Sequence, residues 1–313
     1  MSIENVVISI DIGGTKTGIG IFMPGKGLLG DLVLPTQPEA GCKALIERIY
    51  GNAHALLDEL GISFERVMGI GMLSPGPLDL VNGTIVHAPM LGWREIPLVK
   101  IAQDIFKLPV SLQGDTAGSA LGEYAYGCGG EKPNSLIYIT VSTGVGSGII
   151  LDGKIYNGAF DAAGELGHLK ISDGGADCPC GGRGCLETVA SGTGIARLAL
   201  ERTGRALSAK DVFELAKVGE TAFAEYAGII KDAGSALGIG VATLIQLFDP
   251  NIVILGGSVS NNYCMLEPHI INVLSQRVQN YASRKTAVRK TALPNGHNAL
   301  LGAGEFFIKS NHL

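Results

Sequence analysis

The sequence is poor in charged and aromatic residues. Charged residues make up 17% of the 313 positions and aromatic residues 6%, with a single tryptophan. The 24 Lys and Arg residues are outnumbered by 29 Asp and Glu residues, which gives a net charge of −5. This balance supplies no broad basic surface, so we expect neither nucleic acid nor an anionic membrane as a main partner. Any anion must be held locally.

Uninterrupted hydrophobic runs long enough to cross a bilayer are also missing. The apolar stretch 136–151 is too short and too rich in Ser, Thr and Gly, and the stretch 236–257 is broken by an Asp-Pro pair. The first residues include Ser2 and Glu4, where a signal peptide would place basic and then apolar residues. We therefore predict a cytoplasmic protein with a large core.

Cysteine is scarce, yet three of the six cysteines fall within CPCGGRGC, residues 178–185. Three cysteines cannot pair among themselves without a remainder, and a chain of this length needs no disulfide framework. A metal site is the better explanation, because His168 would complete a Cys3His zinc site with Cys178, Cys180 and Cys185. The three glycines between the cysteines would allow positive φ values in a short loop. The alternative is a chance cluster of small buried residues.

Two segments share the same layout of a strand, a Gly-rich polar turn and a second strand. They are VVISIDIGGTKTGIGIFMPGK (6–26) and LIYITVSTGVGSGIILDGK (136–154). In both, the apolar alternation resumes immediately after the turn, which indicates a hairpin. We interpret the two halves as diverged copies. The layout excludes the commoner nucleotide folds, which place a helix after the first Gly-rich turn.

The two turns are candidate phosphate sites, because backbone N–H groups in a turn can hold an anion. The candidate donors are Gly13, Gly14, Thr15, Thr143 and Gly144. A Gly-rich turn between strands is usually only a turn. Two matching turns, with Asp11 closing the first strand, favour the phosphate interpretation, although Asp11 alone could serve to cap its turn.

The remaining pattern alternates strands and helices. It predicts helices at 41–60, 98–107, 115–126, 192–203, 209–217, 220–247 and 299–308, and strands at 67–73, 109–113 and 252–258. This pattern predicts a two-lobed α/β protein. We expect a smaller lobe of residues 1–118 plus 299–313 and a larger lobe of residues 119–298, with the zinc-binding segment at 164–187.

Asp115 stands where a strand meets the predicted helix 115–126. The plain interpretation is an N-cap residue. A helix N-terminus also stabilises an ionised carboxylate at this position.

Together these motifs resemble the ROK family of sugar kinases and sugar-responsive repressors, within the actin, Hsp70 and hexokinase superfamily. The resemblance is carried by DIGGTK (11–16), SPGP (74–77), GDTAGSALGE (114–123), STGVGSG (142–148), GELGH (164–168), CPCGGRGCLE (178–187) and ILGGS (254–258). It spans nearly the whole chain. It implies a two-lobed actin-like ATPase (ribonuclease H-like) fold, and ATP, Mg²⁺ and Zn²⁺ as cofactors.

The resemblance also implies roles for single residues. Asp115 would be the base that takes the proton of the sugar hydroxyl, and Asp11 would help to organise Mg²⁺. Nucleotide binding is implied for Asp11, Gly13, Gly14, Thr15, Lys16, Thr143, Gly144, Gly256 and Gly257. Sugar binding is implied for Gly76, Gly114, Glu165, His168 and Glu187.

The implied activity is that of an ATP-dependent hexose kinase acting on a sugar hydroxyl, with C6 the favoured position. N-acetylmannosamine, N-acetylglucosamine and fructose kinases of the same family remain alternatives, as do a sugar-responsive regulator and a zinc-stabilised binding module without catalysis. The regulators carry a helix-turn-helix domain ahead of the first hairpin, and here the first strand begins by Val6, so we expect an enzyme. The family also implies a homodimer.

Two positions depart from the family pattern. Gly114 stands where sugar kinases often have Asn, and Met90 stands where an Asn commonly precedes Leu-Gly-Trp. Both changes remove an amide that could contact the sugar. Strict glucose specificity is therefore not implied, and a bulkier sugar such as an N-acetylhexosamine is compatible with the extra room.

Overall fold

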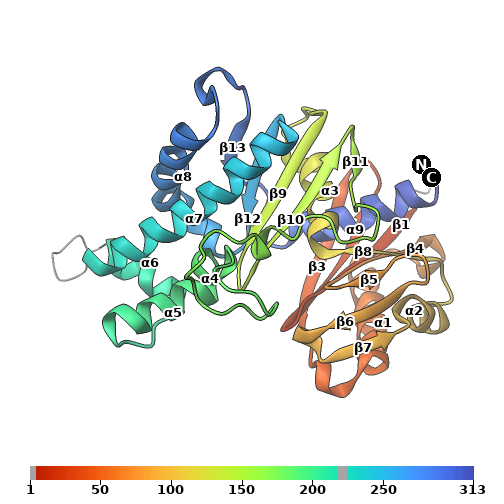
Figure 1. Cartoon of the computed structure of the whole chain (residues 1–313). Helices are drawn as coiled ribbons and strands as arrows, with labels where there is room; N and C mark the ends of the chain where they lie inside the picture. The colour runs from red at the N-terminus through yellow and green to blue at the C-terminus, as the bar shows by residue number, and fades with distance from the viewer. Residues whose placement is uncertain (1–4, 218–223) are drawn as a thin grey trace. The chain divides into compact units, whose positions relative to one another are not determined.

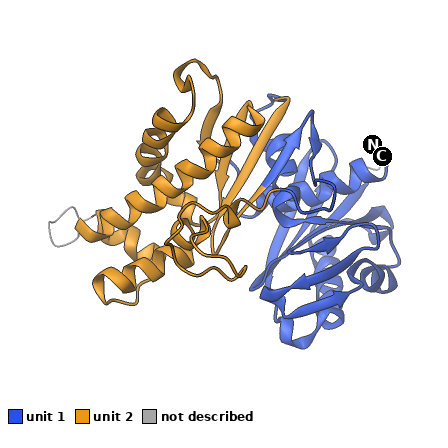
Figure 2. Ribbon diagram, in the orientation of Figure 1, with its two compact units in different colours: residues 1–132, 148–163, 292–313 blue, residues 133–147, 164–291 orange. Residues whose placement is uncertain are grey.

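The computed structural model describes residues 5–217 and 224–313 (Figure 1). By its packing the chain divides into two compact units (Figure 2). Unit 1 consists of residues 1–132, 148–163 and 292–313, and unit 2 of residues 133–147 and 164–291.

The first sheet has five strands in the order β3-β2-β1-β4-β8. Their bounds are β1 Val6–Ile12, β2 Lys16–Met23, β3 Gly27–Pro35, β4 Val67–Ser74 and β8 Val110–Gly114. Strands β1 to β3 form an antiparallel meander, whereas β4 runs parallel to β1 and β8 runs parallel to β4. The carboxyl ends of β1, β4 and β8 therefore meet at one edge of the sheet.

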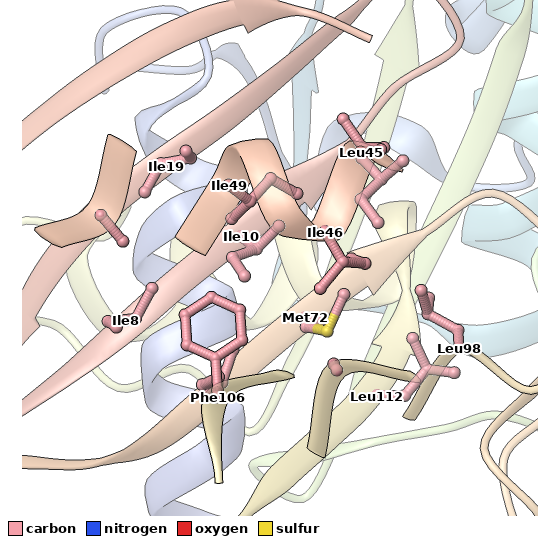
Figure 3. Packing of buried hydrophobic residues seen from close by; sticks show 14 of the residues in the cluster. Ile8, Ile10, Ile19, Leu45, Ile46, Ile49, Met72, Leu98, Phe106 and Leu112 are labelled. Carbon is pink, nitrogen blue, oxygen red and sulfur yellow. The ribbon is translucent and has the colours of Figure 1, made fainter. Parts of the chain in front are cut away.

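Helices cover both faces of this sheet. Unit 1 contains α1 Cys42–Glu59, α2 Leu98–Phe106, α3 Asp115–Gly122 and α9 His297–Ser310, and a small sheet of β5 Leu78–Asp79, β6 Thr84–Ala88 and β7 Trp93–Ile96. Alternate residues of β1 point to opposite faces. Ile8 and Ile10 pack with Ile46 of α1 and Phe106 of α2 (Figure 3), whereas Val7 packs against α9.

The second sheet also has five strands, in the order β11-β10-β9-β12-β13. Their bounds are β9 Ser135–Val141, β10 Val145–Leu151, β11 Lys154–Ile155, β12 Ile252–Gly256 and β13 Ala287–Lys290. The helices of unit 2 are α4 Glu187–Ala190, α5 Gly192–Thr203, α6 Ala209–Lys217, α7 Ala224–Phe248 and α8 Tyr263–Arg277.

The two sheets repeat one layout. In each, three strands consecutive in sequence are followed by two strands from later in the chain, which add next to the first strand. Strand β12 runs parallel to β9, as β4 runs parallel to β1. The prediction of two similar strand–turn–strand segments, at 6–26 and 136–154, is confirmed.

Most predicted helices and strands are present within one to three residues of the expected bounds. The predicted start of the helix at 220 lies outside the described residues, and α7 is described from Ala224. The elements not predicted from the sequence are β3, the small sheet β5–β7, β11, α4, α8 and β13. Helix α8 has weak amphipathic periodicity and contains Pro268, which usually ends a helix.

Within the described part of the chain, α7 is the one helix long and apolar enough to cross a membrane by length and composition. Of its most apolar 18-residue window, 67% is buried, as in the central helix of a globular core. It ends at Phe248, directly before the Asp249-Pro250 pair that the sequence analysis identified as a break.

Helices α3 and α9 of unit 1 approach so closely that glycine is required at their crossing. A Cβ added to Gly302 of α9 would lie 1.9 Å from the carbonyl oxygen of Gly118, and one added to Gly122 of α3 would lie 1.9 Å from the carbonyl oxygen of Asn298. Both obstacles are backbone atoms, which cannot rotate away. The position of α3, which begins with Asp115, thus depends on these glycines.

We expect Gly302→Ala to lower the free energy of unfolding by about 1–3 kcal/mol or more, because the added methyl group must push two helix backbones apart. Gly51→Ala is the matched control, since Gly51 is exposed in the middle of α1 with open space around its Cα. That change should be neutral or stabilise the protein by up to about 1 kcal/mol. Urea unfolding monitored by circular dichroism measures both, and equal midpoints for the two variants would contradict the close crossing.

Candidate functional site

The turn between β1 and β2 offers two unused backbone donors. The N–H of Gly13 donates to the carbonyl of Lys16 (2.9 Å), so this donor is already satisfied inside the turn. Within the described residues, the N–H groups of Gly14 and Thr15 make no hydrogen bond. The predicted phosphate donors of this turn therefore reduce to Gly14 and Thr15, while Gly13 contributes its lack of a side chain. A Cβ there would lie 2.8 Å from the Lys16 carbonyl oxygen.

The turn between β9 and β10 is built in the same way. The N–H of Ser142 donates to the carbonyl of Gly144 (2.9 Å) and closes the turn. The N–H groups of Thr143 and Gly144 have no hydrogen-bond partner in the part of the chain that the structure describes. Each half of the chain thus presents a turn with two consecutive backbone donors that the described residues leave unused, and such donors are available to an anion.

Two carboxylates lie close together at the edge of the first sheet. Asp11 is the next-to-last residue of β1 and Asp115 follows β8 directly, so the parallel order β1-β4-β8 brings both to the same edge. Burial, and to a lesser degree the negative charge of Asp115, raise the pKa of Asp11 to about 7. Gly76, which follows β4, belongs to the same edge. Two neighbouring carboxylates favour a cation beside them.

The structure corrects the prediction that Asp115 is an N-cap residue. Gly114 occupies the N-cap position of α3, and Asp115 is the first residue inside the helix. Its Oδ1 accepts a hydrogen bond from the N–H of Thr116 (2.7 Å), which fixes the carboxylate in the first turn. The positive end of the helix dipole still favours the ionised form.

The two positions that depart from the family pattern differ in their surroundings. No atom lies within 4 Å of a Cβ built on Gly114, and its φ of −63° suits any residue. Met90 is 59% exposed, and a Cβ on Gly14 would lie 3.1 Å from the Met90 side chain. Met90 therefore lies against the first turn, whereas Gly114 faces open space.

The predicted zinc ligands converge in unit 2. The ligand atoms of His168, Cys178, Cys180 and Cys185 all lie within 4.8 Å of one another. His168 Nδ1 is 3.5 Å from Cys178 Sγ, and Cys180 Sγ is 3.8 Å from Cys185 Sγ. A tetrahedral zinc with Zn–S bonds of about 2.3 Å requires sulfur atoms about 3.8 Å apart, so the donor set and its spacing fit zinc.

Glycines shape the loop that carries the cysteines. Gly181 and Gly184 have φ values of +88° and +70°, as the sequence analysis expected, whereas Gly182 does not adopt a positive φ. Gly182 has a different role: a Cβ there would lie 3.4 Å from Cys180 Sγ and 3.6 Å from Cys185 Sγ. Its N–H lowers the pKa of the Cys180 thiol, which favours the thiolate that binds a metal.

Two glutamates flank His168. Glu187 Oε1 lies 3.4 Å from His168 Nδ1 and accepts a hydrogen bond from the Cys178 thiol (3.2 Å). Glu165 Oε2 lies 3.8 Å from Nε2 on the other side of the ring. A Cβ on Gly144 would lie 3.0 Å from Glu187 Oε2. The cysteine cluster therefore adjoins the second turn, and Glu187 lies between them.

A cavity of about 560 Å³ opens beside the second turn, entirely within unit 2. Its lining includes Thr143, and it also contains residues that the sequence analysis missed, from α5, α6 and the short helix 259–262: Thr193, Ala196, Lys210, Phe213, Glu214, Asn261 and Asn262. No local motif marks these residues, because they come together only through helix packing.

Gly256 and Gly257, at the end of β12, have tight packing contacts of their own. A Cβ on Gly256 would lie 2.3 Å from the Tyr138 hydroxyl oxygen, and one on Gly257 would lie 2.5 Å from the Val141 carbonyl oxygen. Both contacts are with β9, the neighbouring strand, or its side chains. The next residue, Ser258, lines the cavity.

Comparison with known proteins gives a consistent result. A family model described as "ROK family" matches residues 7–310. A glucokinase from Halalkalibacterium halodurans is 35% identical over 268 residues, which is 81% of this chain and 80% of that protein. A xylose repressor from Bacillus spizizenii is 31% identical over 242 residues, 77% of this chain and 60% of that protein. The crystal structure of a ROK family glucokinase from Streptomyces griseus in complex with glucose and AMPPNP matches with a TM-score of 0.81 at 27% identity, covering 96% of this chain and 99% of that chain.

We expect about one zinc per chain in protein purified without chelator, because four ligands from two segments already converge. Cys180→Ser should reduce the zinc content below about half an equivalent, since it removes one of the four donors. Cys264→Ser is the matched control, because Cys264 is exposed and lies outside the cluster. Inductively coupled plasma mass spectrometry measures the metal. Equal zinc in both variants would show that the cluster is not the metal site.

Proposed function

The chain belongs to the ROK family, and on that basis we propose that it is an ATP-dependent hexose kinase that transfers the γ-phosphate of ATP to a sugar hydroxyl. Its two mixed sheets with covering helices have the actin-like ATPase fold of the solved ROK structures. The observation that carries the proposal is the placement of two carboxylates, Asp11 and Asp115, at one edge of the first sheet. The first Gly-rich turn follows β1 at the same edge.

Backbone donors would bind the nucleotide phosphates. Gly14 and Thr15 in unit 1, and Thr143 and Gly144 in unit 2, each provide N–H groups that the chain itself does not use. Lys16 is exposed next to the first turn and adds a positive charge. Bound Mg²⁺ would neutralise charge on the transferred phosphate, and Asp11 would hold it directly or through water. The cavity beside the second turn has the size and the hydroxyl and amide lining for an adenosine group.

Asp115 would be the catalytic base. Its carboxylate is oriented by the Thr116 N–H and stabilised in the ionised form by the N-terminus of α3. It would accept the proton of the sugar hydroxyl while the hydroxyl oxygen attacks the γ-phosphorus and ADP leaves. Gly114, at the same sheet edge, leaves open space for the sugar beside it, and Gly76 follows β4 at that edge.

The cysteine cluster would support the sugar-binding residues of unit 2. His168 directs Nδ1 toward the cysteines and Nε2 toward Glu165, so a metal on Nδ1 leaves Nε2 for a sugar hydroxyl. Glu165 and Glu187 are suitable partners for pairs of hydroxyls, because each carboxylate accepts two charge-assisted hydrogen bonds. Zinc would supply a fixed anchor for this segment and take no part in the chemistry.

A second candidate is a sugar-responsive regulator without catalysis, because the xylose repressor is 31% identical to this chain. The two functions differ in one measurable respect. A kinase consumes ATP only when a suitable sugar is present, so a coupled assay with glucose, mannose, fructose, N-acetylglucosamine and N-acetylmannosamine separates them. Absence of turnover with every sugar, in protein that binds one of them, would favour the regulator. Homodimer formation remains a prediction.

We expect Asp115→Asn to lower kcat by roughly 10²- to 10⁴-fold, because the amide cannot accept the proton. The fold and ATP affinity should remain close to those of the parent protein, since Asn is nearly isosteric and its oxygen can still accept the Thr116 N–H. Asp58→Asn, at an exposed position of α1, controls for the change in net charge. Steady-state kinetics and calorimetric ATP binding measure both effects. Near-normal turnover in Asp115→Asn would exclude this residue as the base.

We expect Gly114→Asn to shift relative kcat/KM toward glucose and away from bulkier sugars. The new amide would enter open space and offer a hydrogen bond that is worth about 1–3 kcal/mol when a buried hydroxyl otherwise lacks a partner. Gly51→Asn, on the exposed face of α1, is the control. The ratio of kcat/KM for glucose and for the preferred N-acetylhexosamine is measured in all three proteins. An unchanged ratio would mean that residue 114 does not face the sugar.

A further inference from the structure

Thr36 makes an unusual set of hydrogen bonds with the first turn. It follows β3 directly and is 0% exposed. Its hydroxyl donates to the carbonyl oxygen of Gly13 (2.7 Å), 23 residues away, and its N–H donates to the carbonyl oxygen of Thr15 (2.9 Å). Two carbonyl groups of the turn are thus held by one buried residue that is not part of the turn.

The direction of the hydroxyl hydrogen can be deduced. Thr17 Oγ1 lies 3.0 Å from Thr36 Oγ1, and either atom could donate by geometry alone. A hydroxyl has one hydrogen, and Gly13 offers only an acceptor to Thr36. Thr36 therefore donates to Gly13 and accepts from Thr17. The two hydrogen bonds therefore run in one direction: the Thr17 hydroxyl donates to Thr36, and the Thr36 hydroxyl donates to Gly13.

The hydrogen bond to Gly13 controls the orientation of a phosphate donor. The carbonyl of Gly13 and the N–H of Gly14 belong to the same trans peptide group, which is planar, so they point in opposite directions. A peptide between two glycines meets little steric resistance to rotation of its plane. By holding the carbonyl on the side of Thr36, the hydroxyl directs the free Gly14 N–H to the opposite side.

Thr36 is itself held rigidly. The Arg48 guanidinium of α1 donates to the carbonyl oxygen of Thr36 (2.9 Å), to that of Pro35 and to the side chain of Gln37. Trp93 Nε1 donates to the carbonyl oxygen of Pro38 (3.1 Å). The segment 35–38 is therefore fixed at both ends.

A threonine hydroxyl also holds a carbonyl group of the second turn, in unit 2. The Thr193 hydroxyl donates to the carbonyl oxygen of Thr143 (2.8 Å), which shares its peptide group with the free N–H of Gly144. Thr193 is exposed and lines the cavity, so it has room to contact a ligand as well. Thr36 has no exposed surface. Any effect of Thr36 on a ligand must therefore pass through the turn. A substitution of Thr36 tests the positioning of the turn without removing a direct ligand contact, which a substitution of Thr193 would not do.

We propose that Thr36 is a positioning residue for nucleotide binding, which locks the Gly13–Gly14 peptide with its N–H toward the phosphates. The inference rests on the proposed ATP-binding function of this turn. Without the hydroxyl, the peptide populates both orientations, and in one of them a carbonyl oxygen faces the phosphate. Apparent affinity falls in proportion to the fraction of the competent orientation.

The test compares three variants by calorimetric titration with Mg²⁺–ATP. Thr36→Val keeps the shape but loses the hydroxyl, and we expect its Kd for ATP to rise about 5- to 30-fold, the range for loss of one buried hydrogen bond. Thr36→Ser retains the hydroxyl and should restore affinity to within about twofold of the parent. Thr17→Val is the matched control, because it removes a neighbouring buried hydrogen bond but leaves the bond from Thr36 to Gly13 in place.

Kinetics separate this role from a general loss of stability. KM for ATP should rise in Thr36→Val while KM for the sugar stays near the parent value, and unfolding midpoints of Thr36→Val and Thr17→Val should be similar. Equal ATP affinity in Thr36→Val and Thr17→Val overturns the inference. If the parent binds ATP but phosphorylates no hexose, the proposed kinase function fails while the binding comparison still decides the role of Thr36. If the parent binds no ATP, both are wrong.

Discussion

The parallel pairing of β1, β4 and β8 is the constraint on which the candidate site of unit 1 depends. Three segments distant in the sequence end at the same sheet edge, and the residues that follow them have the chemistry of the site. Asp11, Gly76 and Asp115 come from these three ends. The cost of the arrangement is visible in the pKa of Asp11, which burial and the nearby Asp115 raise to about 7. A sheet edge that gathers carboxylates in this way is suited to a bound cation.

In unit 2, the polar groups of the candidate site lie on loops and not at the ends of strands. The segment from Glu165 to Glu187 has little regular structure, and the ligand atoms of its His168, Cys178, Cys180 and Cys185 lie within 4.8 Å of one another. Glu187 lies between this cluster and Gly144 of the second turn. One metal ion would therefore fix the loop and, through Glu187, the surroundings of the turn. Small local ligand sets can replace a hydrophobic core where function requires exposed loops.

Local patterns predicted the hairpins, most helices and the four members of the cysteine and histidine cluster, because periodicity and ligand spacing are properties of neighbouring residues. Interactions between distant segments were not predictable. Thr36 reaches Gly13 across 23 residues and lies in an extended segment without a motif. The use of the Gly13 N–H within the turn, and the place of Asp115 inside α3 instead of at its N-cap, depend on single hydrogen bonds and on one residue of register. Helix α8 was missed because its proline and weak periodicity concealed it.

The order in which the chain is made has a consequence for folding. Strands β1 and β2 are synthesised long before α9, but Val7 and Phe22 on one face of their sheet are covered by Leu301 and Phe307 of α9. Nearly three hundred residues are synthesised before that face can be buried. During this interval a nascent unit 1 exposes an apolar surface, which is the kind of surface that chaperones bind and that promotes aggregation. Contacts of such long sequence separation also slow folding, so this side of the first sheet's core cannot be completed before α9 has been synthesised.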